Sequence, residues 1–192
     1  MIEVRFHGRG GQGAVVASEI LATALFKEGK FVQAFPAFGV ERRGAPVMAF
    51  LRFDDAPIRR RSQIYEPDHV VVLDPTLLLA VDVTAGLKPH GSILINSEAP
   101  PESFPALNRF VVATVPAGEI AVAHGLGTRT NPIVNTAILG AFARLTGFVS
   151  LETLIEAIAE KLPERQRERN QAAARAAYDA VKIAAALERS TL

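Results

Sequence analysis

Three glycines near the N-terminus most constrain how this chain can fold. Gly8, Gly10 and Gly13 have the spacing Gly-x-Gly-x-x-Gly, and they separate two runs with different periodicity, residues 2–7 and 12–28. The first run alternates apolar and polar residues, which predicts a β-strand. The second repeats apolar residues at helical spacing, which predicts an α-helix. A strand, a glycine turn and a helix in this order are typical of the turns that hold a dinucleotide at the edge of an open α/β sheet.

The following hundred residues continue the alternation of strands and short connecting segments. Residues 70–73, Val-Val-Val-Leu, are apolar throughout, as in strands buried on both faces of a parallel sheet. A helix-compatible stretch, residues 75–86, follows them. Other strands are expected at residues 31–35, 47–53, 92–96 and 110–115. We therefore predict an α/β fold with a doubly wound, mostly parallel Rossmann-like sheet.

The last third of the chain has helical periodicity and forms the predicted helical C-terminal extension. Asn131 and Pro132 are expected to cap and open its first helix, and Ser150 to cap the second. No Gly-, Ser- or Pro-rich linker separates this part from the rest. We predict a single domain, residues 1–192, with a helical part at about 131–192. The three helices are expected at residues 133–145, 151–161 and 164–187.

Composition excludes several kinds of site. The chain has 192 residues and no cysteine, so it cannot form disulfides, thiolate zinc sites or cysteine-ligated iron–sulfur clusters. The 21 Lys and Arg nearly balance the 20 Asp and Glu, which gives no reason to expect nucleic acid as a partner. Its histidines are scattered, so we expect no metal site and no catalytic residue in this chain. No leader or membrane-length apolar run is recognisable, and we expect a cytoplasmic protein without membrane contact.

The glycine turn lacks one residue that dinucleotide binding needs. An acid about 20 residues after the turn, at the end of the second strand, normally holds the ribose hydroxyls. Residues 33–36, Gln-Ala-Phe-Pro, contain no carboxylate, so we do not expect an NAD or FAD site. Two interpretations stay open. The glycines either only permit positive φ and close packing, or they contact an anion or a partner chain, for which Arg9 is well placed.

Three further places carry polar groups at a turn, a strand end or a helix start. Residues 41–43, Glu-Arg-Arg, precede Gly44, and they form either a solvated loop with an internal ion pair or a site for phosphate or carboxylate. Asp74 follows a buried strand, where it is either a helix cap or a functional group. Asn131 and Asn135 are four residues apart at a predicted helix start, so both can face one ligand or partner.

Taken together, five motifs closely resemble those of the γ subunit of pyruvate:ferredoxin oxidoreductase (pyruvate synthase). They follow in the family's order and cover nearly the whole chain. They are His-Gly-Arg-Gly-Gly-Gln-Gly at residues 7–13, Phe-Gly-Val-Glu-Arg-Arg-Gly at 38–44, Ser-Gln-Ile-Tyr-Glu-Pro-Asp at 62–68, Leu-Asp-Pro-Thr at 73–76, and Asn-Pro-Ile-Val-Asn-Thr-Ala-Ile-Leu-Gly-Ala at 131–141.

The resemblance implies a subunit of a multi-chain 2-oxoacid oxidoreductase. In that family pyruvate, coenzyme A (CoA) and oxidised ferredoxin give acetyl-CoA, carbon dioxide and reduced ferredoxin, reversibly. The α and β subunits hold thiamine diphosphate and magnesium, and the β and δ subunits hold the [4Fe-4S] clusters. The γ chain packs on this core and is implied to help place CoA. The isolated chain is therefore expected to be inactive and to bind no cofactor by itself.

The resemblance and the residues together give a hypothesis for the site. Helix N-terminal amides and guanidinium groups suit the phosphates of CoA. The loop at residues 38–45 differs from the Met-Ser-Gln-Arg-Gly-Gly type of the indolepyruvate enzymes, which favours pyruvate. The alternatives are another 2-oxoacid (2-oxoglutarate, branched-chain or indolepyruvate), a purely structural subunit, and a free-standing nucleotide-dependent enzyme. The residues expected to line a CoA or intersubunit surface are Gly10, Gly11, Gln12, Gly13, Arg42, Arg43 and Asn135.

Overall fold

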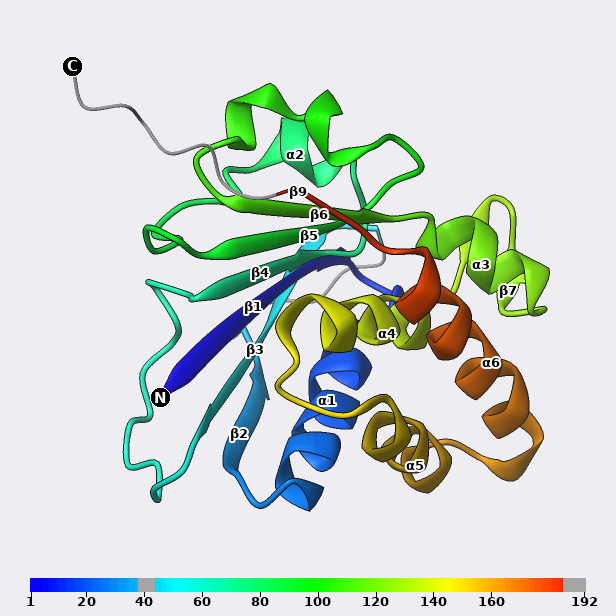
Figure 1. Cartoon of the computed structure of the whole chain (residues 1–192), viewed down its shortest axis with the longest axis horizontal. Helices are drawn as coiled ribbons and strands as arrows, with labels where there is room; N and C mark the ends of the chain where they lie inside the picture. The colour runs from blue at the N-terminus through cyan, green and yellow to red at the C-terminus, as the bar shows by residue number, and fades with distance from the viewer. Residues whose placement is uncertain (38–43, 185–192) are drawn as a thin grey trace.

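A seven-stranded sheet organises the chain in the computed structural model, which describes residues 1–37 and 44–184 (Figure 1). Its strand order is β2-β3-β1-β4-β5-β6-β9. Strands β1, β4, β5 and β6 are parallel, whereas β3 and β9 run antiparallel to their neighbours. This confirms the predicted α/β fold with a mostly parallel sheet. The strands are β1 (Ile2–Arg9), β2 (Phe31–Pro36), β3 (Pro46–Asp54), β4 (His69–Val72), β5 (Ser92–Asn96), β6 (Val111–Val115) and β9 (Lys182–Ala184).

The two faces of the sheet are covered unequally. The longer helices α1, α4, α5 and α6 lie on one face, over the larger apolar core, and the one-turn α2 lies on the other (Figure 1). None of the helices in the described part is long and apolar enough to cross a membrane. The helices are α1 (Ala14–Lys27), α2 (Leu77–Ala80), α3 (Ala117–Ala123), α4 (Asn135–Thr146), α5 (Leu151–Lys161) and α6 (Glu164–Ala180); a small hairpin joins β7 (Gly127–Thr128) to β8 (Asn131–Pro132).

The first β-α-β unit is split by a third strand. β3 pairs along the whole of β1, from Ile2 opposite Phe53 to Arg9 opposite Pro46, and β2 then pairs with the outer edge of β3. The end of β2 is therefore separated from the glycine turn by the width of β3. An acid at the end of β2 would not lie beside the turn, which is a second reason, besides the missing carboxylate, why a dinucleotide site does not fit.

The predicted helix at residues 75–86 is wrong apart from one turn. α2 ends at Ala80, because local hydrogen bonds compete with helix formation beyond it. Asp82 accepts hydrogen bonds from the backbone and the hydroxyl of Thr84, at 3.0 and 2.8 Å. The carbonyls of Val83 and Ala85 accept from the Arg5 guanidinium instead of from later amides.

Two predicted helix ends in the C-terminal part are also wrong. Asn131 and Pro132 form β8 instead of opening the first helix, and α4 begins at Asn135. The predicted helix 164–187 ends at Ala180, because residues 182–184 pair with the free edge of β6. The predicted cap of the second helix is confirmed, since the Ser150 hydroxyl accepts from the Thr153 amide at 3.1 Å.

Charged side chains are buried along the β1 face that looks away from the long helices. Glu3 forms an ion pair with Arg52, which stands opposite it on β3 at 3.1 Å and is fully buried. The Arg5 guanidinium donates to Nε2 of His7 at 3.0 Å. Burial, and after it the positive charge of Arg5, lowers the pKa of His7 from 6.5 to about 3, against the opposing effect of Asp82. His7 is therefore neutral in the folded chain and accepts at Nε2.

We expect His7 to make the fold sensitive to mild acid. The unfolded chain binds a proton at His7 below the unfolded pKa of 6.5, and the folded chain binds it only near 3. The free energy of unfolding should therefore fall as the pH drops below 6.5, by up to about 1.4 kcal/mol per pH unit. In His7→Gln this slope should decrease, measured by urea denaturation from about pH 7 to pH 5. His124→Gln is the control: His124 is half-buried at the end of α3, and this variant should keep the pH dependence of the unfolding free energy because His7 is still present. An unchanged pH dependence in His7→Gln would contradict the role given to His7.

The closest helix contact lies between α4 and α6. Thr136 and Asn170 are hydrogen bonded at 2.7 Å, and Gly140 packs directly against the Ala174 backbone further along both helices. The second contact lies four residues closer to the C-terminus than the first on both helices. The two helices are therefore parallel, with their N-termini at the same end. A Cβ atom at Gly140 would overlap the carbonyl oxygen of Ala174, so only glycine allows this approach.

Gly140→Ala should therefore destabilise the chain strongly. We expect a loss of at least about 3 kcal/mol in the free energy of unfolding, because the helices must separate along their whole contact. Gly118→Ala is the matched control: it is also in a helix, and its Cβ would lie 3.6 Å from the nearest atom, in Pro132. Its stability should change by less than about 1 kcal/mol. Similar losses in the two variants, measured by chemical denaturation, would disprove the close-contact argument.

Candidate functional site

The glycine turn links the end of β1 to the start of α1. Gly11 and Gly13 have φ angles of 94° and 79°, which side chains other than glycine rarely adopt. The Gly10 amide donates to the carbonyl of Ala45 at 2.9 Å, and its carbonyl accepts from the Gly44 amide at 3.1 Å. These bonds fasten the turn to the C-terminal end of the 38–44 motif. The two sequence motifs are thus joined at Gly10 and Gly44.

The N-terminus of α1 has no side-chain cap. Gly13 is the capping residue, and the first turn contains no acidic residue. The first amides of a helix have no partners within the helix, and the helix dipole is positive at this end. The turn therefore has the geometry of an anion site, and Gly11 faces open space.

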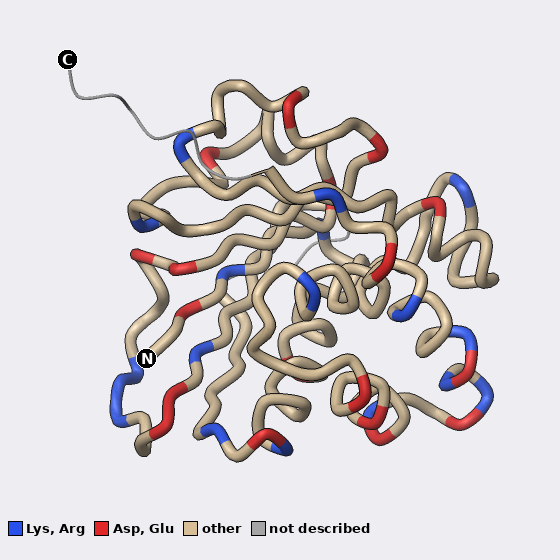
Figure 2. The backbone as a smooth tube through the Cα atoms, in the orientation of Figure 1, with Lys and Arg blue, Asp and Glu red and all other residues tan. Residues whose placement is uncertain are grey.

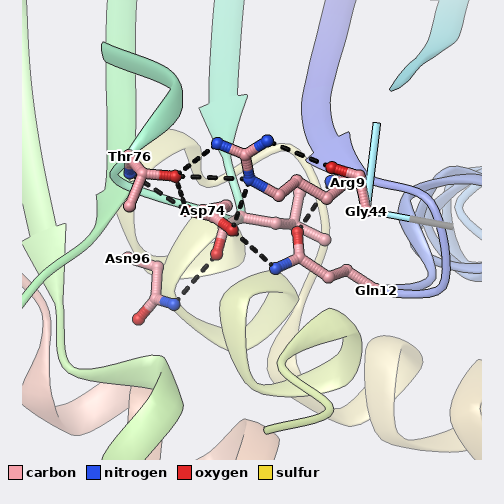
Figure 3. A network of polar contacts seen from close by, with 7 residues as sticks. Arg9, Gln12, Gly44, Asp74, Thr76 and Asn96 are labelled. Carbon is pink, nitrogen blue, oxygen red and sulfur yellow. Dashed lines mark hydrogen bonds and ion pairs between the residues drawn. The ribbon is translucent and has the colours of Figure 1, made fainter. Parts of the chain in front are cut away.

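A polar network fixes the turn to the ends of the neighbouring strands (Figure 3). Oδ2 of Asp74 accepts from Nε2 of Gln12 at 2.9 Å and from Nε of Arg9 at 3.2 Å, and the Arg9 guanidinium also donates to the Thr76 hydroxyl at 2.7 Å. Oε1 of Gln12 accepts from the Arg9 amide at 2.8 Å, and a third Arg9 nitrogen donates to the Gly44 carbonyl at 3.1 Å. The oxygen and the nitrogen of the Gln12 side-chain amide are therefore both hydrogen bonded, to Arg9 within the turn and to Asp74 beside it. The Arg9 charge, which the sequence made a candidate anion contact, is turned toward Asp74.

Asp74 acts as the anchor of this network. Partial burial raises its pKa, but the hydrogen bonds from Thr76 and Gln12 and the charge of Arg9 outweigh burial, and the net pKa lies below the ordinary value. Its Oδ1 accepts from the Thr76 amide just ahead of α2, at 3.0 Å. Of the two interpretations left open by the sequence, the structure favours the structural one: Asp74 binds the turn before α2 and holds the glycine turn.

Asn135 is the predicted site residue that the fold brings to the glycines. It begins α4, is only 8% exposed, and lies against the first turn of α1. A Cβ at Gly13 would be 2.7 Å from its Nδ2 atom, so glycine is required here by contact as well as by φ. Its Oδ1 accepts from the Thr136 amide at 2.9 Å. Asn131, expected on the same face, is exposed in β8 instead.

The other predicted pair lies outside the described residues. Arg42 and Arg43 fall between residue 37 and residue 44. Of their motif, the structure therefore describes only Gly44 and its bond to Gly10. Within the described ranges, no group of three or more His, Asp or Glu side chains is arranged to hold a metal ion.

Sequence reasoning missed a pocket beside Asn135. It has a volume of about 470 Å³ and lies between the start of α4, the first turns of α6 and the loop after α3. Arg165 and Arg169 line it, and Asn135 forms part of its wall. The available signal was the four-residue spacing of the two arginines on a predicted helix, which puts them on one face.

Gly13→Ala tests the contact between the turn and α4. Gly29 is the matched control, because it has a similar φ of 83° but no atom within 4 Å of the place that an added methyl carbon would take. Gly29→Ala should cost about 1 kcal/mol from backbone strain alone, and Gly13→Ala about 2–3 kcal/mol because it also displaces Asn135. Urea denaturation of both variants measures the difference; equal losses would show that Asn135 does not pack on Gly13.

Comparison with known proteins identifies the family. The profile of the family described as pyruvate ferredoxin/flavodoxin oxidoreductase matches residues 3–180. The chain is 56% identical over 190 residues to the Pyrococcus furiosus protein named pyruvate/ketoisovalerate oxidoreductases common subunit gamma, covering 95% of this chain and 98% of that one. It also resembles the crystal structure of the Thermotoga maritima pyruvate oxidoreductase subunit PORC, with a TM-score of 0.80, 38% identity, and coverage of 95% and 98%.

A more distant structure shares the fold alone. It is the 2-oxoglutarate:ferredoxin oxidoreductase from Magnetococcus marinus, solved with 2-oxoglutarate, CoA and succinyl-CoA bound. The TM-score is 0.72 at 20% identity, over 93% of this chain and 31% of that longer one. The motif resemblance found in the sequence is confirmed by the closer matches. The chain belongs to the pyruvate ferredoxin/flavodoxin oxidoreductase family, as a γ-type subunit.

Proposed function

We propose that this chain is the γ subunit of a pyruvate:ferredoxin oxidoreductase and that its glycine turn forms part of the CoA site. In the assembled enzyme, pyruvate and CoA are converted to acetyl-CoA and carbon dioxide while ferredoxin is reduced. The α, β and δ subunits are its partners, and the chain packs on their thiamine diphosphate core in the cytoplasm. The observation that carries the CoA assignment is the uncapped N-terminus of α1 with the Asn135 amide against it.

The chemistry of the turn fits a phosphate group. Backbone amides at a helix N-terminus bind phosphate by hydrogen bonding and by the helix dipole. Gly10, Gly11 and Gly13 have no side chains that would keep a diphosphate away from these amides. Gln12 keeps the turn in shape from within, through its bonds to Arg9 and Asp74. On this proposal Arg42 and Arg43, outside the described residues, add charge from the adjoining loop.

The redox cofactors belong to the other subunits on this proposal. This chain has no cysteine with which to hold an iron–sulfur cluster. When bound in the α and β subunits with magnesium, thiamine diphosphate supplies the nucleophilic carbon for decarboxylation. The contribution of this chain is to bind and orient CoA, so that its thiol reaches the reacting centre in a fixed geometry.

The choice of 2-oxoacid is the finer part of the proposal. The named relatives act on pyruvate or on pyruvate and ketoisovalerate, and the 38–44 loop motif is of the pyruvate type. Ferredoxin reduction by the purified complex with pyruvate, 2-oxoisovalerate, 2-oxoglutarate and indolepyruvate separates the candidates. The highest kcat/KM is expected with pyruvate.

Asn135→Ala in the assembled enzyme tests the CoA site. Loss of one hydrogen bond to a charged phosphate costs about 1.5–3 kcal/mol, so the KM for CoA should rise about tenfold or more. The KM for pyruvate should not change, because pyruvate binds at the thiamine core. Asn131→Ala is the matched control: it removes the same side chain four residues earlier, where it is exposed on the hairpin.

The result also separates a binding role from a structural one. A complex of Asn135→Ala that assembles normally and keeps its KM for CoA would leave this chain a purely structural subunit. The double variant Arg42→Ala/Arg43→Ala tests the same surface a second time, since loss of these charges should also weaken CoA binding and raise the KM for CoA. Tight binding of NAD or FAD to the isolated chain would instead support a free-standing enzyme.

A further inference from the structure

The pocket beside Asn135 lies where two helices begin. α4 and α6 run parallel, and Asn170, the partner of Thr136, is the seventh residue of α6, whereas Thr136 is the second of α4. α6 therefore starts more than one turn earlier and projects beyond the start of α4. This projecting part forms one wall of the 470 Å³ pocket, and the loop at Gly125 forms another.

Two arginines line this pocket from one face of α6. Arg165 and Arg169 are four residues apart, and Nη1 of Arg169 lies 3.4 Å from the position of a Cβ at Gly125. Neither arginine side chain forms an ion pair or donates a hydrogen bond to another residue in the ranges 1–37 and 44–184. Positive and negative charges alternate along the first turns of α6 (Figure 2). The acids of that stretch, Glu164 and Glu168, do not line the pocket.

Asn135 adds an amide donor at the pocket wall. Its side chain is more than nine-tenths buried, and its Oδ1 is already used by the Thr136 amide. Nδ2 has no hydrogen-bond partner within the described part of the chain, yet the atom is not sealed from solvent. Nδ2 can therefore donate to an acceptor that enters the pocket, in place of solvent.

The charged groups that line the pocket favour an anion. The lining residues include two arginines and no carboxylate. Because the helices are parallel, their dipoles have their positive ends at the same end of the pair, and the start of α4 lies beside the first turns of α6. Arginine forks and helix amides together match the oxygens of a phosphate group. The volume is larger than a lone phosphate needs and falls in the range of small-molecule sites.

We propose that this pocket binds the phosphate group of a phosphorylated small molecule, held by Arg165, Arg169 and the Asn135 amide. The assignment shares the Asn135 amide with the CoA proposal, but its two arginines play no part in the glycine turn. Two sources share this chemistry: a phosphate of CoA itself, such as its 3′-phosphate, and a separate phosphorylated ligand.

The test compares Arg165→Gln/Arg169→Gln with the wild-type full chain by isothermal titration with pyrophosphate. Loss of both guanidiniums should lower pyrophosphate affinity at least tenfold, and added salt should weaken the wild type more than the variant. Arg175→Gln is the matched control, since Arg175 is exposed on the same helix but outside the pocket. The pyrophosphate affinity of this variant should equal that of the wild type. Both arginines of the pocket are exposed, so folding should be retained, as circular dichroism will verify.

Titration with CoA and 3′-dephospho-CoA identifies the source. If the double variant has a lower affinity for CoA but an unchanged affinity for dephospho-CoA, the group in the pocket is the 3′-phosphate. If only pyrophosphate binding is weakened, the pocket takes a separate phosphorylated ligand. Equal pyrophosphate affinity of variant and wild type, or no binding by the wild type, overturns the proposal. Unchanged affinity with failed assembly of the complex would make the arginines a subunit contact. The CoA site at the glycine turn is judged separately, by the KM for CoA of Arg42→Ala/Arg43→Ala in the assembled enzyme, because Asn135→Ala removes an amide that both proposals use.

Discussion

The close contact between α4 and α6 is the constraint on which the polar sites depend. Gly140 lets the α4 backbone approach Ala174, and the buried bond from Thr136 to Asn170 fixes the register, contributing about 1 kcal/mol. With this register, the start of α4 lies beside the first turns of α6 and Asn135 is pressed against Gly13. A shift of one turn would move Asn135 by about 5.4 Å and separate the glycine turn from the pocket. Apolar packing thus determines where two polar sites meet.

The arrangement of β1, β3 and β2 shows how a glycine turn of the dinucleotide-binding type can occur without a dinucleotide site. β3 lies between β1 and β2, and the fully buried Arg52 on β3 pairs with Glu3 on β1. Breaking such a buried pair by removing one partner costs about 3–5 kcal/mol, so the position of β3 is held firmly. The end of β2, which would hold a ribose in a dinucleotide fold, is therefore displaced from the turn, while the N-terminus of α1 keeps its uncapped amides. The Asp74 carboxylate serves the network of the turn and not a ribose.

Local rules predicted the elements that local interactions determine. The glycine turn, strands β1 to β6 and the Ser150 cap show in short-range patterns of the sequence, and these predictions are confirmed. Two of the failures involve distant partners: Arg5 takes the carbonyls after α2, and the edge of β6 draws residues 182–184 out of the helix. The third is local, because Asn131 and Pro132 pair with Gly127 and Thr128 in a small hairpin. In the candidate site, the glycines could be predicted from their spacing. The contact of Asn135 with Gly13 could not, because it follows from helix packing over more than half the chain.

Asn135 connects the two anion-favouring places, and this limits what can occupy them together. Its side chain touches the glycine turn and also lines the arginine pocket, so the field of the α4 N-terminus acts on both. Two independent anions bound there would repel each other across one short side chain. Two phosphates joined in one molecule lose less entropy, because the second group binds at the effective concentration set by its linker. If both proposed sites bind phosphate, a single ligand that carries separated phosphates, as CoA does, is therefore favoured over two separate ligands.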